Sequence, residues 1–268
     1  TALPLMFALV CMNGGPRTLI APGLWQMILR GIIMCGAYFC YYLALAALPM
    51  ATTAALYFSS PLFITLLSVL VLKENVGPRR WAAVAVGFCG VVVMLRPGTE
   101  LFDWARVLAV SSGLFYGLSM VSARSLGARH SAAALAFYGN AVFLVIALLL
   151  TLVFGSGSFD HSSHKSLEFL MRGWVSPSWN DLGVMMACGV IAAVGLTLLT
   201  QAYRVTEANV VAPFEYSALI WSVIFGWIFW RDWPDTVAWL GISLIVGAGL
   251  YVLYRENLQS RTLRGAGP

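Results

Sequence analysis

The sequence predicts an all-α integral membrane protein built from two inverted five-helix repeats. Of the 268 residues, 60% are hydrophobic and only 10% are charged, whereas roughly a quarter are charged in an ordinary soluble domain. The mean hydropathy is +0.83, and apolar runs of about 20 residues, enough to span a bilayer, recur along the chain. A charged motif also recurs in the second half of the chain. These observations exclude a soluble enzyme as the default, and function is expected within or between the spans.

Eight full spans and one fragment are expected. The first twelve residues resemble the second half of a span, so the first helix and part of the second of a ten-helix protein are expected to be absent. Arg30 is the only charge in the next span, and Pro49 and Met50 alone join that span to its successor, which predicts a tight antiparallel hairpin. The full spans are predicted at residues 25–48, 51–72, 81–95, 104–122, 131–154, 182–203, 209–230 and 236–254.

The one long loop, residues 155–180, is polar. Its segment 167–171 is expected to form a short interfacial helix. His161 and His164 could suggest a metal site, but no cysteine or cluster of carboxylates accompanies them. We interpret them as loop polarity and expect no metal site.

The basic residues predict an orientation in the membrane. On alternate sides of the expected spans, 11 of the 16 Lys and Arg residues lie on the side of the C-terminus and 5 on the other. By the positive-inside rule this places the C-terminus in the cytoplasm and the long loop outside, as expected for a multi-pass protein of a bacterial inner membrane.

An internal repeat is the most informative pattern. A basic residue, an acidic residue and, seven positions later, a tryptophan occur as Lys73, Glu74 and Trp81, and again 158 residues later as Arg231, Asp232 and Trp239. After a one-residue gap, Gly90 and Gly249 also correspond. The copies lie five spans apart, and an odd spacing gives them opposite orientations, as in secondary transporters with inverted repeats. The expected repeats are residues 1–98 and 99–256, followed by a cytoplasmic tail, 257–268.

A set of short stretches carries a family resemblance: 48–56 (LPMATTAAL), 60–63 (SPLF), 72–74 (LKE), 87–98 (GFCGVVVMLRPG), 212–216 (APFEY) and 249–255 (GLYVLYR). Through them the chain resembles the drug/metabolite transporter superfamily and, within it, the EamA-type permeases. The nearest members are YddG-type amino-acid exporters and S-adenosylmethionine-uptake-type permeases. The resemblance implies ten helices in two inverted repeats, cytoplasmic termini, a central substrate cavity, and export or uptake of small metabolites.

Glu215 is the only acidic residue well inside an expected span. An ionised carboxylate there is costly, so the group must be protonated, paired or facing a wet cavity. It could bind a substrate amine or couple transport to protons. Alternatively, it is a protonated group that forms a hydrogen bond with a neighbouring helix.

Tyr57 corresponds to Glu215 at the offset of 158 residues, which would place a phenol and a carboxyl on facing helices. Ser60 lies in the same matching region, and Tyr38 and Tyr42 share one helical face. Together these side chains suit an amphipathic zwitterion. Packing in the helix core is the alternative for each aromatic residue.

Further candidates for substrate binding lie inside the spans: Tyr116, Ser119, Asn140, Gln201, Tyr216 and Trp221. A buried amide without a partner is costly, so Asn140 and Gln201 must face other helices or water, and a helix-helix hydrogen bond is their alternative role. Glycines at 113 and 117, and at 87 and 90, are spaced for close helix contacts.

Several classes of function lack their motifs. The five cysteines lie in apolar stretches without a CxxC pair, and we interpret them as core residues. The sequence has no Gly-rich phosphate loop, which argues against an ATP-driven pump, and no basic cluster interleaved with aromatics, which argues against nucleic-acid binding. No cofactor is expected.

The leading hypothesis is therefore a secondary transporter and exporter of small amphipathic metabolites, above all amino acids including aromatic ones. It would work by alternating access at a midplane cavity. One alternative is an uptake permease for a nucleoside-like metabolite such as S-adenosylmethionine. Another is a lipid-modifying membrane enzyme, for which Glu100, Asp103 and Arg106 form the only titratable group near a span end. The expected partners are the substrate and the lipid bilayer, and the sequence is compatible with a monomer.

Overall fold

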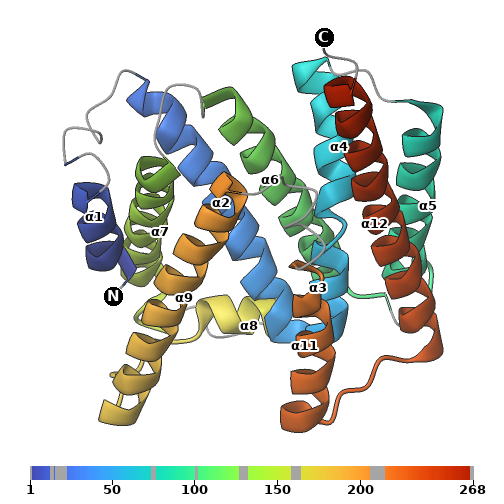
Figure 1. Ribbon diagram of the computed structural model, residues 1–268. Coiled ribbons are helices and arrows are strands. Elements are labelled where there is room, and N and C mark those ends of the chain that lie inside the picture. The colour runs from blue at the N-terminus through green and yellow to red at the C-terminus, as the bar shows by residue number, and fades with distance from the viewer. Residues whose placement is uncertain are drawn as a thin grey trace. The chain divides into compact units, whose positions relative to one another are not determined.

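The computed structural model describes residues 2–12, 15, 23–73, 77–99, 102–126, 132–157, 164–205 and 215–265. Among them every regular element is a helix (Figure 1). The helices are α1 (Ala2–Met12), α2 (Leu24–Ala47), α3 (Met50–Tyr57), α4 (Ser60–Leu72), α5 (Pro78–Leu95), α6 (Trp104–Leu126), α7 (Ala132–Phe154), α8 (Lys165–Met171), α9 (Trp179–Val205), α11 (Ser217–Phe225), the π-helical turn η2 (Gly226–Trp230) and α12 (Thr236–Gly265).

The predicted all-α membrane class is confirmed. In the described part of the chain, five helical segments are long and apolar enough to cross a bilayer, and three shorter apolar helices lie in α9, α11 with η2, and α12. The interfacial helix expected in the long loop forms as α8. By contrast, α12 continues to Gly265, well past the predicted end of its span, because the following residues are mostly good helix formers without proline.

The predicted span 51–72 is discontinuous. α3 ends at Tyr57, and α4 begins at Ser60 with Pro61 in its first turn. Proline has no N–H to donate to the carbonyl of Tyr57, so the helical hydrogen-bond ladder cannot run through this point. Just before this break, the hydroxyl of Ser59 donates to the carbonyl of Leu56 at 2.6 Å.

The chain forms two compact units, each of which takes residues from both sides of the predicted repeat boundary at 98/99. One unit comprises residues 1–36 and 122–205, and the other comprises residues 37–121 and 206–268. We call them the α7 unit and the α5 unit. α2 and α6 contribute residues to both.

In the α5 unit, α5 and α12 run side by side in opposite directions (Figure 1). Glycines allow this close approach: a Cβ added to Gly90 would lie 2.7 Å from the Cβ of Leu244, and the space beside Gly241 is filled by Met94. The predicted close contact at Gly87 and Gly90 is therefore confirmed. At Gly113, a Cβ would lie 2.9 Å from the carbonyl oxygen of Tyr57, so α6 also packs closely where α3 ends.

In the α7 unit, α1 packs against α7 and α9. The rings of Phe7 and Phe137 lie 6.0 Å apart, and the amide of Asn140 donates to the sulfur of Met6 at 3.1 Å. His164 precedes α8, and its Nδ1 accepts a hydrogen bond from the N–H of Ser166, which is a capping role.

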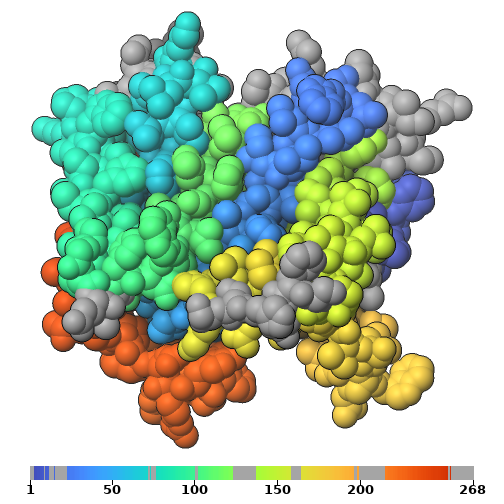
Figure 2. All heavy atoms as spheres, turned by 180° about the vertical axis from the view of Figure 1, so that it is seen from behind, coloured from blue at the N-terminus to red at the C-terminus, as the bar shows by residue number. Residues whose placement is uncertain are grey.

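The outer surface carries the apolar side chains expected of a lipid-facing protein. Figure 2 shows the surface of α7 in yellow-green. Its exposed apolar side chains are Leu144, Val145, Leu148, Leu149 and Leu152, a stripe that repeats with the helical period. Such a stripe is stable against lipid and would be unfavourable against water.

Candidate functional site

An aromatic cluster surrounds the end of α3, inside the α5 unit. The ring of Tyr57 meets those of Tyr41 and Tyr116 edge to face, each at 5.4 Å between centroids. Phe58 packs against Tyr57 at 5.6 Å and against Tyr216 at 5.0 Å. The aromatic cluster, Tyr41, Tyr57, Phe58, Tyr116 and Tyr216, thus joins α2, α3, α6 and the start of α11.

Glu215 lies next to this cluster. Its side chain is half-buried and close enough to Tyr57 and Tyr216 to act on both hydroxyl groups electrostatically. The phenol of Tyr57 and the carboxyl of Glu215, which correspond to each other at the offset of 158 residues, therefore lie in the same region of the α5 unit. A carboxyl beside aromatic rings can attract an amine while the rings bind an apolar or aromatic part of the same molecule.

The other predicted site residues fall in several places. Tyr38 is near enough to Tyr57 to interact with it, whereas Tyr42 is 49% exposed and contacts Tyr41. Ser60 and Ser119 are buried in the α5 unit. Trp221 is 54% exposed on α11 and packs against Phe225.

Two predicted site residues belong to the α7 unit. Asn140 forms its hydrogen bond with Met6 there. Gln201 lies within α9, and its side chain is outside the described residues, as is Pro213. Nothing in the described geometry assigns Asn140 or Gln201 to the aromatic cluster.

The prediction did not include Tyr41 or Phe58 among the binding residues. Tyr41 lies three positions after Tyr38, so the two share a helical face as readily as Tyr38 and Tyr42 do. The signal for Phe58 was its offset of 158 residues from Tyr216. The rings of these corresponding residues contact each other, as expected where two related repeats meet on their common axis.

The same correspondence recurs at two helix ends. Lys73 terminates α4 and Arg231 terminates η2, each in the left-handed conformation, with φ of 56° and 59°. These residues are the first positions of the repeated motif. A basic side chain at a helix C-terminus is favourable because it opposes the negative end of the helix dipole.

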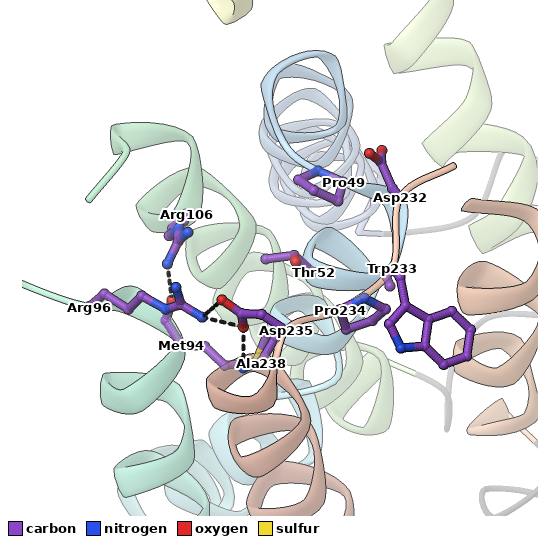
Figure 3. Close-up of a pocket in the computed structure, with 11 residues that line it drawn as sticks. Pro49, Thr52, Met94, Arg96, Arg106, Asp232, Trp233, Pro234, Asp235 and Ala238 are labelled. Atoms are coloured by element: carbon purple, nitrogen blue, oxygen red, sulfur yellow. Dashed lines mark hydrogen bonds and ion pairs between the residues drawn. The ribbon is translucent and has the colours of Figure 1, made fainter. Parts of the chain in front are cut away.

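A small cavity of about 170 Å³ lies where α5 ends and α3, α6 and α12 begin (Figure 3). Its walls are Pro49, Ala51, Thr52, Met94, Arg96, Arg106, Asp232, Trp233, Pro234, Asp235 and Ala238. The positive-inside expectation places this end of the helices outside the cytoplasm.

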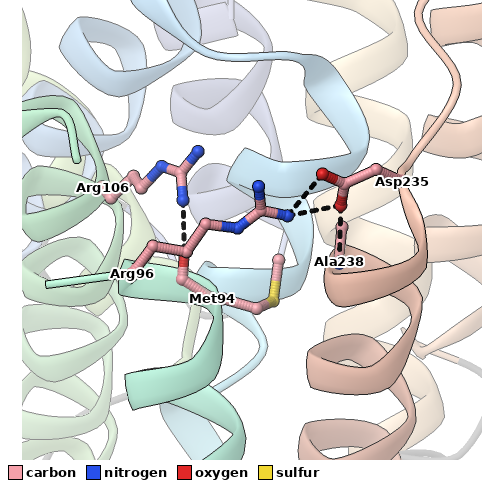
Figure 4. A network of polar contacts seen from close by, with 5 residues as sticks. All are labelled: Met94, Arg96, Arg106, Asp235 and Ala238. Carbon is pink, nitrogen blue, oxygen red and sulfur yellow. Dashed lines mark hydrogen bonds and ion pairs between the residues drawn. The ribbon is translucent and has the colours of Figure 1, made fainter. Parts of the chain in front are cut away.

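A polar network fixes the helix ends beside this cavity (Figure 4). Arg96, at the end of α5, forms an ion pair with Asp235, and one of its N–H groups donates to Oδ2 at 2.6 Å. Asp235 also accepts from the N–H of Ala238 at 2.8 Å and so caps α12. Arg106 donates to the carbonyl of Met94 at 2.6 Å, which satisfies an acceptor at the end of α5. The network therefore connects the end of α5 to the starts of α6 and α12.

We expect Asp235→Asn to lower the free energy of unfolding by about 1 kcal/mol, the value of a part-exposed ion pair. Hydrogen bonds from Arg96 and from the N–H of Ala238 hold the pKa of Asp235 below its usual 3.8. The contribution of the ion pair is therefore complete above pH 3.8 and is lost only as the pH falls through the lower folded value.

Unfolding in detergent, followed by tryptophan fluorescence, should give the same difference between wild type and variant at every pH from about 5 to 8. Asp232→Asn is the control, because Asp232 lines the same cavity without an ion pair among the described residues. An equal loss in the control would show that the Arg96 pair is not the cause.

Comparison with known proteins gives a family match over nearly the whole chain. The model of the EamA-like transporter family matches residues 1–96 and residues 103–255. A crystal structure 18% identical in sequence superposes with a TM-score of 0.62, covering 94% of this chain and 83% of the other, which supports the fold alone.

Bacterial relatives are named for different substrates. A riboflavin transporter of Rhizobium johnstonii is 31% identical over 88% of this chain and 72% of its own length. An S-adenosylmethionine uptake transporter of Rickettsia prowazekii is 25% identical over 86% of this chain and 72% of its own. A pseudopaline exporter of Pseudomonas aeruginosa is 27% identical over 84% of this chain and 74% of its own.

Proposed function

Because the chain belongs to the EamA-like transporter family, we propose that it is a secondary transporter of small amphipathic metabolites that carry an aromatic ring. The family match confirms the resemblance indicated by the sequence. We infer the substrate class from the aromatic cluster around Tyr57 and from the carboxyl of Glu215 near it. Rings bind rings in offset or edge-to-face contacts, and the carboxyl supplies the polar end of the site.

Aromatic amino acids are our first candidate substrates, and export is our proposed direction. Their amine would lie toward Glu215 and their ring against Tyr57. A nucleoside-like or flavin substrate is the second candidate, supported by the relatives named for riboflavin and S-adenosylmethionine, since both compounds contain planar aromatic rings. The relatives reported above are all transporters, which favours transport over the lipid-modifying alternative.

The proposed mechanism is alternating access by inverted repeats at residues 1–98 and 99–256. The discontinuous helix at Pro61 supports it, since broken helices are typical of transporter binding sites. The chain is a multi-pass membrane protein. We place it in a bacterial inner membrane with residues 257–268 in the cytoplasm, on the evidence of its basic residues and its bacterial relatives.

Transport into liposomes tests this proposal. The panel contains labelled phenylalanine, tyrosine, alanine, riboflavin and S-adenosylmethionine, each with protein-free liposomes as the blank. We expect saturable, protein-dependent movement of the aromatic compounds and little movement of alanine. Preference for alanine would overturn the substrate class, and movement of riboflavin or S-adenosylmethionine alone would favour the second candidate.

We expect Tyr57→Leu to weaken the apparent affinity for aromatic substrates by up to about tenfold, since one ring pair between substrate and Tyr57 is worth roughly 0.5–1.5 kcal/mol beyond the buried area. Non-aromatic substrates should change little. Phe229→Leu is the matched control, because Phe229 lies on the surface of η2 and is 70% exposed. Equal weakening for aromatic and aliphatic substrates would remove Tyr57 from the binding site.

A further inference from the structure

A groove lies between α5 and α12, near the N-terminal end of α5. It measures about 310 Å³ and is lined by Arg79, Ala82, Ala83 and Val86 of α5 and by Gly247, Ala248 and Tyr251 of α12. The lining is largely apolar, and the groove is open to the outside. All of it belongs to the α5 unit, in which the two helices pack together (Figure 1).

Small side chains create this groove. A Cβ added to Gly247 would meet open space, whereas Gly90 and Gly241, farther along the same helix pair, are closely packed. The internal repeat places larger residues at the equivalent positions of the other helix end: Leu240 and Phe88 correspond to Ala82 and Gly247. The groove is therefore not a simple consequence of repeating the same helix pair.

The mouth of the groove is basic and lies at one end of the apolar helix α5. Arg79 is in the first turn of α5, is exposed, and makes no ion pair with any residue that the structure describes. Lys73, at the end of α4, is also exposed. Trp81 and Tyr251 expose amphipathic rings nearby, as residues at the headgroup level of a bilayer commonly do.

We propose that this groove binds one anionic phospholipid. The phosphate lies at Arg79, and one acyl chain follows the shallow channel over Ala82, Val86 and Gly247. The combination fits a lipid better than a second copy of the chain, because a charged mouth with an apolar channel matches a headgroup and its tail. Basic pockets between membrane helices bind anionic headgroups in this way.

Native mass spectrometry of the full chain tests the site. Phosphatidylglycerol and phosphatidylcholine with identical acyl chains are titrated separately into the detergent-solubilised protein. We expect one retained phosphatidylglycerol, preferred over phosphatidylcholine. Arg79→Gln should reduce that preference about fivefold, as expected for one basic residue at a membrane surface. Lys165→Gln, an exposed change on α8, should leave it unchanged.

A second variant tests the channel separately from the charge. Gly247→Leu fills open space, so its melting temperature should equal that of the wild type while binding of both lipids falls. The control for Gly247→Leu is Gly183→Leu, because a side chain at Gly183 also points into open space but lies on α9. An unchanged lipid preference in Arg79→Gln, or wild-type binding in Gly247→Leu, would overturn the proposal. The proposal would also be overturned if the wild type were a dimer and Gly247→Leu made it a monomer, because the groove would then be a contact between two copies of the chain.

Discussion

Gly249→Ala is expected to destabilise the protein by about 3 kcal/mol, at the upper end of the usual cost of overpacking a core. The added Cβ would overlap the hydroxyl oxygen of Tyr216 and lie 2.9 Å from its Cζ. The ring cannot move aside easily, because Tyr216 is only 7% exposed and packs against Phe58. The change therefore disturbs the packing of α12 against the aromatic cluster.

Thermal unfolding in detergent measures this effect, and Tyr216→Phe provides the sharper test. Among the described residues the Tyr216 hydroxyl has no hydrogen-bond partner, so removing it alone should cost little. Combined with Gly249→Ala, it should restore part of the lost stability, because the oxygen that overlaps is gone while Cζ remains close. Gly247→Ala, two residues earlier in open space, is the control. A Gly249→Ala protein as stable as this control would contradict the close packing of Tyr216 against α12.

The helices could be predicted from the sequence because a bilayer fixes the length of an apolar segment. The predicted segments 25–48 and 104–122 correspond closely to α2 and α6 on this basis alone. The break before Pro61 was missed because a proline near the start of a helix is common, and the pattern of hydrophobic residues continues through it. Periodicity shows where apolar residues lie, but not whether each backbone hydrogen bond forms.

The site could be predicted only in part, because binding residues depend on how each helix is rotated. Tyr38 can share a face with Tyr41 or with Tyr42, and only packing against Tyr57 selects Tyr41. The Arg96 and Asp235 pair joins residues 139 positions apart, so no local pattern indicates it. The repeat offset is a long-range signal that local patterns lack: it pairs Tyr57 with Glu215 and Phe58 with Tyr216, and the rings of the second pair are in contact.

Glu215→Gln is expected to uncouple transport from a proton gradient. Glutamine keeps the shape and the hydrogen-bonding capacity of the side chain near Tyr57, but it has no proton to release. A gradient of one pH unit supplies about 1.4 kcal/mol per proton, enough for roughly tenfold accumulation of a substrate moved with one proton. We therefore expect about tenfold accumulation by the wild type and equal concentrations on both sides with the variant.

Liposomes containing purified protein, with and without an imposed pH gradient, measure this difference, and exchange of labelled for unlabelled substrate is measured in the same preparations. Exchange needs no net proton movement, so Glu215→Gln should retain part of it, which also shows that the variant is folded. Glu168→Gln, an exposed carboxyl in the first turn of α8, is the control and should accumulate substrate as the wild type does. A Glu215→Gln protein that still accumulates substrate tenfold would show that the carboxyl binds substrate or neighbouring helices without carrying the coupled proton. Loss of both accumulation and exchange, in a variant that unfolds at the same temperature as the wild type, would instead assign Glu215 to the substrate amine.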